Sequence, residues 1–108
     1  MATVHLSAQF QRDFDAIVLR LVEDAGRPVA IDYAERIRIC VNRLVTHPGI
    51  GAPRRKFEAD ARILIVSPYL IFYDGAPKAV TVTVLRILHE SRRITAKMIS
   101  KGRDDLDS

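Results

Sequence analysis

The amino-acid sequence predicts an α+β fold in which an N-terminal edge strand and an antiparallel helical hairpin precede a three-stranded antiparallel meander. Apolar residues recur at helical spacing in the first half of the chain and at strand spacing after residue 61. Helices that precede strands, instead of alternating with them, are typical of α+β domains. The 108 residues suit one domain over 1–108, with a core over 3–95.

The segment TVHLS (3–7) predicts the edge strand, because polar and apolar side chains alternate over a short run. Ser7 then suits an N-cap, since its hydroxyl can accept a hydrogen bond from the free amides of a first helical turn. Apolar residues recur at helical spacing from Phe10 to Val22. Gly26 is a natural stop, so we expect the first helix to end there.

A second helix is expected to begin at Arg27-Pro28, because proline near a helix start removes no needed donor. Its apolar stripe runs from Ala30 to Val45. The segment THPG (46–49) ends it, because neither proline nor glycine favours continuation. The link between the two helices is short, so they should lie antiparallel as a hairpin.

The second half of the chain predicts three strands and a short final helix. The β-rich runs are RILIV (62–66), YLIFY (69–73) and VTVTVLRILH (80–89). Short turns separate them, so the first and last runs should flank the middle one and lie parallel to each other. A polar segment from Glu90 to Met98 predicts the helix, and residues 99–108 are expected to be frayed.

These strands are apolar on both faces, whereas an antiparallel sheet with one wet face should alternate. One helical hairpin covers one face, and each large apolar side chain left exposed forgoes about 1.5–3 kcal/mol of burial. We therefore predict that a partner chain packs on the far face. The predicted contacts are Ile63, Ile65, Leu85 and Ile87. Alternatively, the final segment folds back over this face, or strong twist closes the sheet on itself.

Charge is distributed unevenly along the chain. Residues 1–53 carry six basic and six acidic side chains, whereas residues 54–103 carry eleven basic and four acidic ones, a balance of +7. The tail adds three acids, which gives the net charge of +4. Such a positive half concentrates polyanions or an acidic protein partner near one surface. The alternative is an ordinary surface of solvated lysine and arginine.

Basic side chains gather where the last strand ends. Together with one arginine of the first long strand, the candidate site residues are Arg62, Arg86, His89, Arg92 and Arg93. Clustered arginines can bind phosphates or dock on a protein, and a ribonuclease would need a base, an acid and cationic stabilisers. In a ribonuclease His89 would be the acid or base, with Glu58 or Glu90 as a base. Arg62 or Arg86 would be the stabiliser, and the remaining alternative is a solvated strand end with salt bridges.

The sequence offers little for other chemistry. One cysteine and three histidines lack the spacing of zinc ligands, so no metal or cofactor is expected. Cys40 fits a buried, inert thiol in a reducing cytoplasm, and Tyr69 and Tyr73 fit packing positions. No apolar run reaches the roughly 20 residues that span a bilayer, and the N-terminus lacks signal-peptide features. We expect a cytoplasmic protein that does not enter the membrane.

Two parts of the sequence resemble the RelE/ParE toxin superfamily. LSAQFQRDFDAIVLRLVEDAG followed by AIDYAERIRICVNRLVTHPGIGAPRR is similar to its N-terminal half. There a helical hairpin ends in a P-x-x-G-x-x-R linker, matched here by Pro48, Gly51 and Arg54. In the second half Arg62, YLIFY and VLRILHESR follow, and the ending I-L-H-x-x-R is similar to the ParE branch, the plasmid-stabilisation toxins. The resemblance covers residues 3–95.

The resemblance implies a toxin of a type II toxin–antitoxin module. ParE-like toxins are understood to inhibit DNA gyrase, which leaves cleaved DNA complexes and blocks replication. The partner would be a ParD-like antitoxin whose C-terminal segment wraps the toxin. The two chains would form a hetero-oligomer that binds operator DNA through the antitoxin.

The alternative is a RelE-like endoribonuclease, because relatives in that branch share the fold but cleave mRNA on the ribosome. Arg62 matches an arginine that precedes a Y-x-x-x-Y strand there, and His89 lies where some members have a catalytic histidine. However, no tyrosine follows Tyr73, and the last strand ends in the ParE manner. The resemblance therefore favours gyrase inhibition by binding, with the five basic residues as target contacts and none as a catalytic residue. A decayed toxin that binds only its antitoxin or DNA is a third hypothesis.

Overall fold

The computed structural model describes residues 1–58 and 60–104 and confirms the α+β class. Within these residues, one sheet holds five strands in the order β1-β5-β4-β3-β2. The helices are α1 (Ala8–Ala25), α2 (Arg27–Asn42) and α3 (Ala96–Asp104), with 3-10 turns η1 (Arg43–Val45) and η2 (Arg55–Phe57). The strands are β1 (Thr3–Leu6), β2 (Ala52–Pro53), β3 (Ala61–Val66), β4 (Tyr69–Asp74) and β5 (Thr81–His89).

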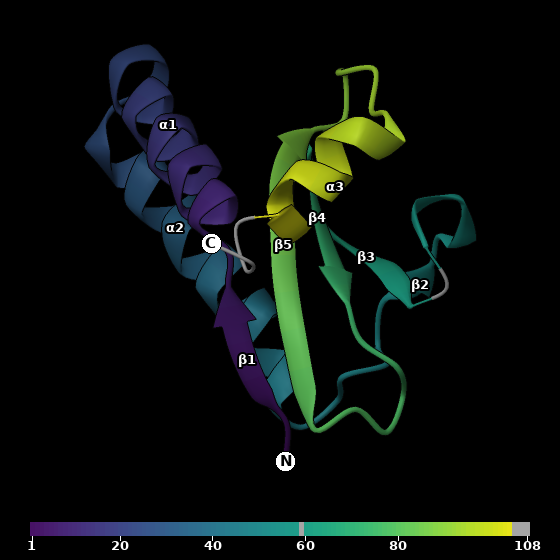
Figure 1. Cartoon of the computed structure of the whole chain (residues 1–108). Helices are drawn as coiled ribbons and strands as arrows, with labels where there is room; N and C mark the ends of the chain where they lie inside the picture. The colour runs from purple at the N-terminus through teal and green to yellow at the C-terminus, as the bar shows by residue number, and fades with distance from the viewer. Residues whose placement is uncertain (59, 105–108) are drawn as a thin grey trace.

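Helices α1 and α2 form the predicted antiparallel hairpin on one side of the sheet (Figure 1). Ser7 caps α1, because its Oγ accepts a hydrogen bond from the amide of Phe10 at 2.9 Å. Gly26 ends α1 with φ of 91°, a conformation that favours glycine, and its amide donates to Val22 O at 3.1 Å. Pro28 lies in the first turn of α2. The start of α1 and the turn between the two helices therefore follow from local sequence.

Replacing Ser7 by alanine is expected to lower the free energy of unfolding by about 1.5 kcal/mol, a loss typical of a buried N-cap. Besides capping α1, Ser7 Oγ donates to Leu85 O at 2.8 Å, so the hydroxyl joins the hairpin to the sheet. Urea denaturation of the two proteins measures the difference. The exposed Ser91→Ala variant is the control, and a loss no larger than its own would contradict this role.

The strand pairing agrees with the predicted meander. Strand β4 pairs antiparallel with β3 on one side and with β5 on the other, so β3 and β5 are parallel. The edge strand β1 adds to the far side of β5 in parallel register, with Thr3 opposite Thr81. The connector after α2 contributes the two residues of β2, which pair with β3.

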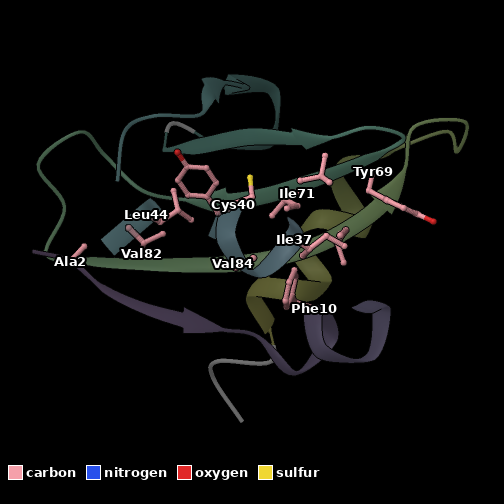
Figure 2. Packing of buried hydrophobic residues seen from close by; sticks show 12 residues of the cluster. Ala2, Phe10, Ile37, Cys40, Leu44, Tyr69, Ile71, Val82 and Val84 are labelled. Atoms are coloured by element: carbon pink, nitrogen blue, oxygen red, sulfur yellow. The ribbon is translucent and has the colours of Figure 1, made fainter. Parts of the chain in front are cut away.

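The hairpin buries one face of the sheet. Its core, drawn in Figure 2, includes Ile37, Cys40 and Leu44 from the hairpin side and Ile71, Val82 and Val84 from the strands. Cys40 is buried, and burial raises the pKa of its thiol while Arg43 lowers it to a smaller extent. This placement agrees with the predicted inert thiol.

Helix α3 covers the opposite face, so the predicted exposed face is wrong for three of its four residues. Ile63 and Leu85 are buried in a second cluster around Ile99 of α3, which is itself fully buried. Ile87 is buried on the hairpin side instead. Ile65 remains 63% exposed. The fold-back of the last segment is therefore the alternative that the structure supports.

A β-bulge in β5 explains why Ile87 lies on the hairpin face instead of the predicted one. Phe72 is opposite Arg86 and Tyr73 is opposite Val84, so Leu85 is an extra residue without its own partner on β4. A bulge inverts the alternation of side chains beyond it. Val84 and Ile87 consequently share the hairpin face, although strict alternation would separate them.

The final helix lies later in the chain than predicted. It begins at Ala96 and ends at Asp104, whereas the prediction placed it over 90–98 and expected fraying from 99. Thr95 opens it, since its Oγ1 accepts from Met98 N at 3.3 Å. Its last turn is held by Arg103, which donates to both carboxylate oxygens of Asp74. The rest of the predicted frayed tail, 105–108, lies outside the described residues.

Candidate functional site

Arg62 links two loops at one end of the sheet. Its Nε donates to Gly75 O at 2.9 Å, and its Nη1 donates to Gly49 O at 3.1 Å and to Gly51 O at 2.7 Å. The Gly51 amide in turn donates to the Tyr73 hydroxyl at 2.8 Å. A Cβ at Gly51 would lie 2.7 Å from that hydroxyl, which explains why the linker motif needs glycine there. The guanidinium of Arg62 therefore has a structural role.

Arg86 is buried in the middle of the fold. Its Nη2 and Nε donate to the two carboxylate oxygens of Asp13 at 2.8 and 2.9 Å, and its Nη1 donates to Met98 O at 3.3 Å. Both side chains of the pair are about 10% exposed or less. This bidentate pair joins α1, β5 and α3. Burial leaves Arg86 no surface for a direct target contact, so that part of the prediction is corrected.

The other three predicted residues, His89, Arg92 and Arg93, are exposed at the end of β5. His89 pairs with Tyr69 across the ladder, whereas Arg62 pairs with Tyr73. These positions on β4 are about 13 Å apart at roughly 3.3 Å per residue. His89 Nδ1 accepts from Ser91 N at 3.0 Å, which leaves Nε2 as the ring nitrogen available for another contact. The five predicted residues thus divide into a loop clamp, a buried ion pair and an exposed cluster.

A groove of about 580 Å³ runs between α1 and the exposed cluster. Helix α1 contributes Arg20 and Asp24, which form an exposed ion pair at 3.4 Å. The opposite wall includes Tyr69, His89 and Arg92. Groups of both charges therefore line the groove. Arg20 is paired with Asp24, whereas Arg92, in the loop after β5, has no ion-pair partner in the described part of the chain.

Aromatic rings support the wall of this groove. The Tyr69 ring meets the rings of Tyr33 and His89 edge to face, each with 5.7 Å between centroids. Burial raises the pKa of the Tyr69 hydroxyl, Tyr33 raises it further, and Arg20 lowers it. Burial therefore favours the protonated hydroxyl, which can donate a hydrogen bond into the groove. Figure 2 shows this hydroxyl at the rim of the core.

Sequence reasoning missed Asp13, Arg20 and Tyr33. Asp13 had a recognisable signal, because it lies three residues after Phe10 and four before Ile17, on the apolar stripe of α1. An acid on such a stripe needs a buried cation as its partner. The places of Arg20 and Tyr33 depend on tertiary packing, and nothing in their local sequence indicates them.

Replacing Arg62 by alanine is expected to lower the free energy of unfolding by about 2 kcal/mol, because three carbonyls lose a charged donor. Arg62→Lys should recover little of this stability, since an ammonium group cannot reproduce the planar arrangement of N–H donors in a guanidinium. Thermal unfolding measures both variants. Arg54→Ala serves as control, because Arg54 is exposed and its side chain donates to Pro53 O of its own loop. An Arg62→Ala protein as stable as this control would contradict the clamp.

Within residues 1–58 and 60–104, no three of the His, Cys, Asp and Glu side chains come together to hold a metal ion. None of the helices in the described part of the chain combines the length and the apolar character needed to cross a membrane.

Comparison with known proteins agrees with the fold. Residues 4–94 match the family model of the ParE toxin of the type II toxin–antitoxin system, parDE. The chain is 28% identical over 98 residues to Toxin ParE1 of Caulobacter vibrioides, across 91% of this chain and 99% of that protein. A solved structure, "Chromosomal ParDE TA system from P. aeruginosa", shares the fold with a TM-score of 0.68 and 23% identity, over 82% of this chain and 96% of that one. The chain therefore belongs to the ParE toxin family of type II toxin–antitoxin systems.

Proposed function

We propose that this toxin inhibits DNA gyrase by binding it, and so blocks DNA replication. The observation that carries the choice of binding over catalysis is the separation of the residues that a ribonuclease would use. Arg62 is committed to three carbonyls, Arg86 to Asp13, and His89 stands apart from both at the end of β5. A general acid, a general base and a cation need to converge on one reacting atom. The described geometry of these three residues supports no such convergence.

The target surface in this proposal is the exposed cluster of His89, Arg92 and Arg93, together with the adjoining groove. In the described part of the chain, Arg92 and Arg93 have no ion-pair partner, so their guanidinium groups are available to carboxylates of another protein. Tyr69 and Arg20 add a ring and a charge at the groove wall. Tyrosine and arginine are enriched among the side chains that contribute most of the binding energy in protein interfaces.

A cognate antitoxin would neutralise the toxin by direct binding. A second groove, of about 410 Å³, lies beside the edge strand β1. Its apolar lining comes from Val4, Leu6, Phe10, Phe14, Ile37, Val41 and Val45. Because β1 pairs with β5 on one side only, an extended apolar segment can lie along it. We propose this groove as the antitoxin site in place of Ile63, Leu85 and Ile87, whereas the exposed Ile65 remains a candidate contact.

A supercoiling assay with purified gyrase tests the target surface. The variant His89→Ala/Arg92→Ala/Arg93→Ala is expected to need at least about ten times more toxin for half-inhibition, a change equivalent to about 1.4 kcal/mol of binding. The control Arg27→Ala/Arg43→Ala also removes two arginine charges, but from exposed positions on the hairpin side, and should inhibit like the parent. Equal inhibition by the triple variant would reject the surface. A parent chain that spares gyrase and cleaves ribosome-bound mRNA would reject the function.

A further inference from the structure

A second basic surface lies away from the exposed cluster, where η2 and α3 meet. We call it the η2–α3 face and define it by Arg55, Lys56, Lys97 and Lys101, all of which are exposed. The two elements are held side by side because Arg103 of α3 donates to Phe57 O of η2. Ile99 and Gly102 turn toward the sheet, so Lys97 and Lys101, one helical turn apart, lie together on the outer side of α3.

The cations of this face have no ion-pair partner in the described part of the chain, in contrast to three exposed arginines of the hairpin. On the hairpin the charges offset one another locally, for example in the Arg20–Asp24, Arg36–Asp32 and Arg38–Glu35 pairs. Two exposed acids lie beside these cations: Glu58 directly follows η2, and Asp104 lies three residues after Lys101 on the same side of α3. The excess of positive charge in the second half of the sequence is therefore concentrated here and around the exposed cluster.

The face lacks the features of a protein-binding surface. The large apolar side chains that are exposed lie on other elements, such as Leu19, Ile31 and Ile39 on the hairpin, and none lies on η2 or α3 among the described residues. Protein interfaces have an apolar core inside a polar rim. Phe57, the aromatic residue of η2, is buried under Lys56 at 4.8 Å and offers no ring on which an unpaired base could stack.

We propose that the η2–α3 face binds the phosphate backbone of duplex DNA without reading its sequence. Four solvated cations on one surface can neutralise about four phosphates, which is the sequence-independent mode of DNA binding. The absence of exposed apolar and stacking groups favours a duplex over an acidic protein or a single strand. This inference goes beyond the proposed function, because it needs neither gyrase nor the antitoxin.

Fluorescence anisotropy with two labelled 20-base-pair duplexes of unrelated sequence tests the proposal on the full chain. For about four phosphate contacts, the slope of log K against log salt should be about −3.6, and both sequences should bind equally. Lys97→Ala/Lys101→Ala should make the slope less steep by about 2 units. The control Arg27→Ala/Arg43→Ala removes two cations from outside the face and should leave the slope unchanged.

Three outcomes would overturn the proposal: a Lys97→Ala/Lys101→Ala slope equal to that of the parent, tighter binding of single-stranded than of duplex DNA, or displacement of DNA by polyglutamate at equal charge concentration. The last would mean that the face recognises acidic protein. Lys97 and Lys101 are exposed, and no hydrogen bond or ion pair of their side chains is described, so circular dichroism should show an unchanged fold. Because gyrase is absent from this assay, a negative result here would leave the proposed inhibition of gyrase untouched, and the supercoiling assay tests that separately.

Discussion

Replacing Asp13 by alanine is expected to lower the free energy of unfolding by about 3–5 kcal/mol, the loss typical of removing one partner of a buried ion pair. The substitution leaves the Arg86 guanidinium buried and without its carboxylate. It also removes the acceptor of the Ile87 amide, which donates to Asp13 Oδ2 at 3.3 Å. Urea denaturation measures the loss, and α3 should be affected too, because Arg86 also donates to Met98 O.

Two further variants separate the buried pair from charge effects in general. Asp32→Ala removes an exposed carboxylate that lies 3.8 Å from Arg36, and should cost less than about 1 kcal/mol. Asp13→Leu/Arg86→Met removes both buried charges together, and should be closer in stability to the parent than Asp13→Ala is. If Asp13→Ala were no worse than Asp32→Ala, the pair would not be holding α1, β5 and α3 together.

Replacing Gly102 by alanine should destabilise the protein by about 3 kcal/mol, although alanine in a helix is normally favoured over glycine by about 1 kcal/mol. Helix α3 approaches β5 so closely that a Cβ at position 102 would lie 2.9 Å from the carbonyl carbon of Leu85 and 3.0 Å from its Cα. Those atoms are backbone and cannot rotate away. The helix must move off the sheet, which uncovers the buried Ile99.

Thermal unfolding and hydrogen exchange across residues 96–104 measure this effect. The control is Lys101→Ala, at the exposed neighbouring position of the same helix, which should be neutral. A Gly102→Ala protein more stable than its parent would show that α3 does not pack on β5 as closely as described.

The sequence predicted the elements whose causes are local. The Ser7 cap, the stop at Gly26 and the three long strands each follow from a few neighbouring residues, and the structure confirms them. The last helix was placed too early, because α3 depends on contacts with Leu85, Asp74 and Phe57 far back in the chain.

The candidate site was harder to predict than the fold. Asp13 and Arg86 are 73 residues apart in sequence, and one bulge at Leu85 reversed the expected faces of the residues that follow it in β5. Arg62 and His89 belong to one predicted site, because both are basic and lie near strand ends. The register places them at opposite ends of β4, and a register depends on turn geometry as well as on the pattern of residue types.

The most direct test of the account is pulse labelling after induced expression of the chain in bacteria that lack its antitoxin, with thymidine and methionine incorporation followed together. A gyrase inhibitor should stop thymidine incorporation first and induce the SOS response, while methionine incorporation continues for a time. Methionine incorporation that stops within minutes, before DNA synthesis falls, would contradict the account and return His89 and Arg62 to the role of catalytic candidates.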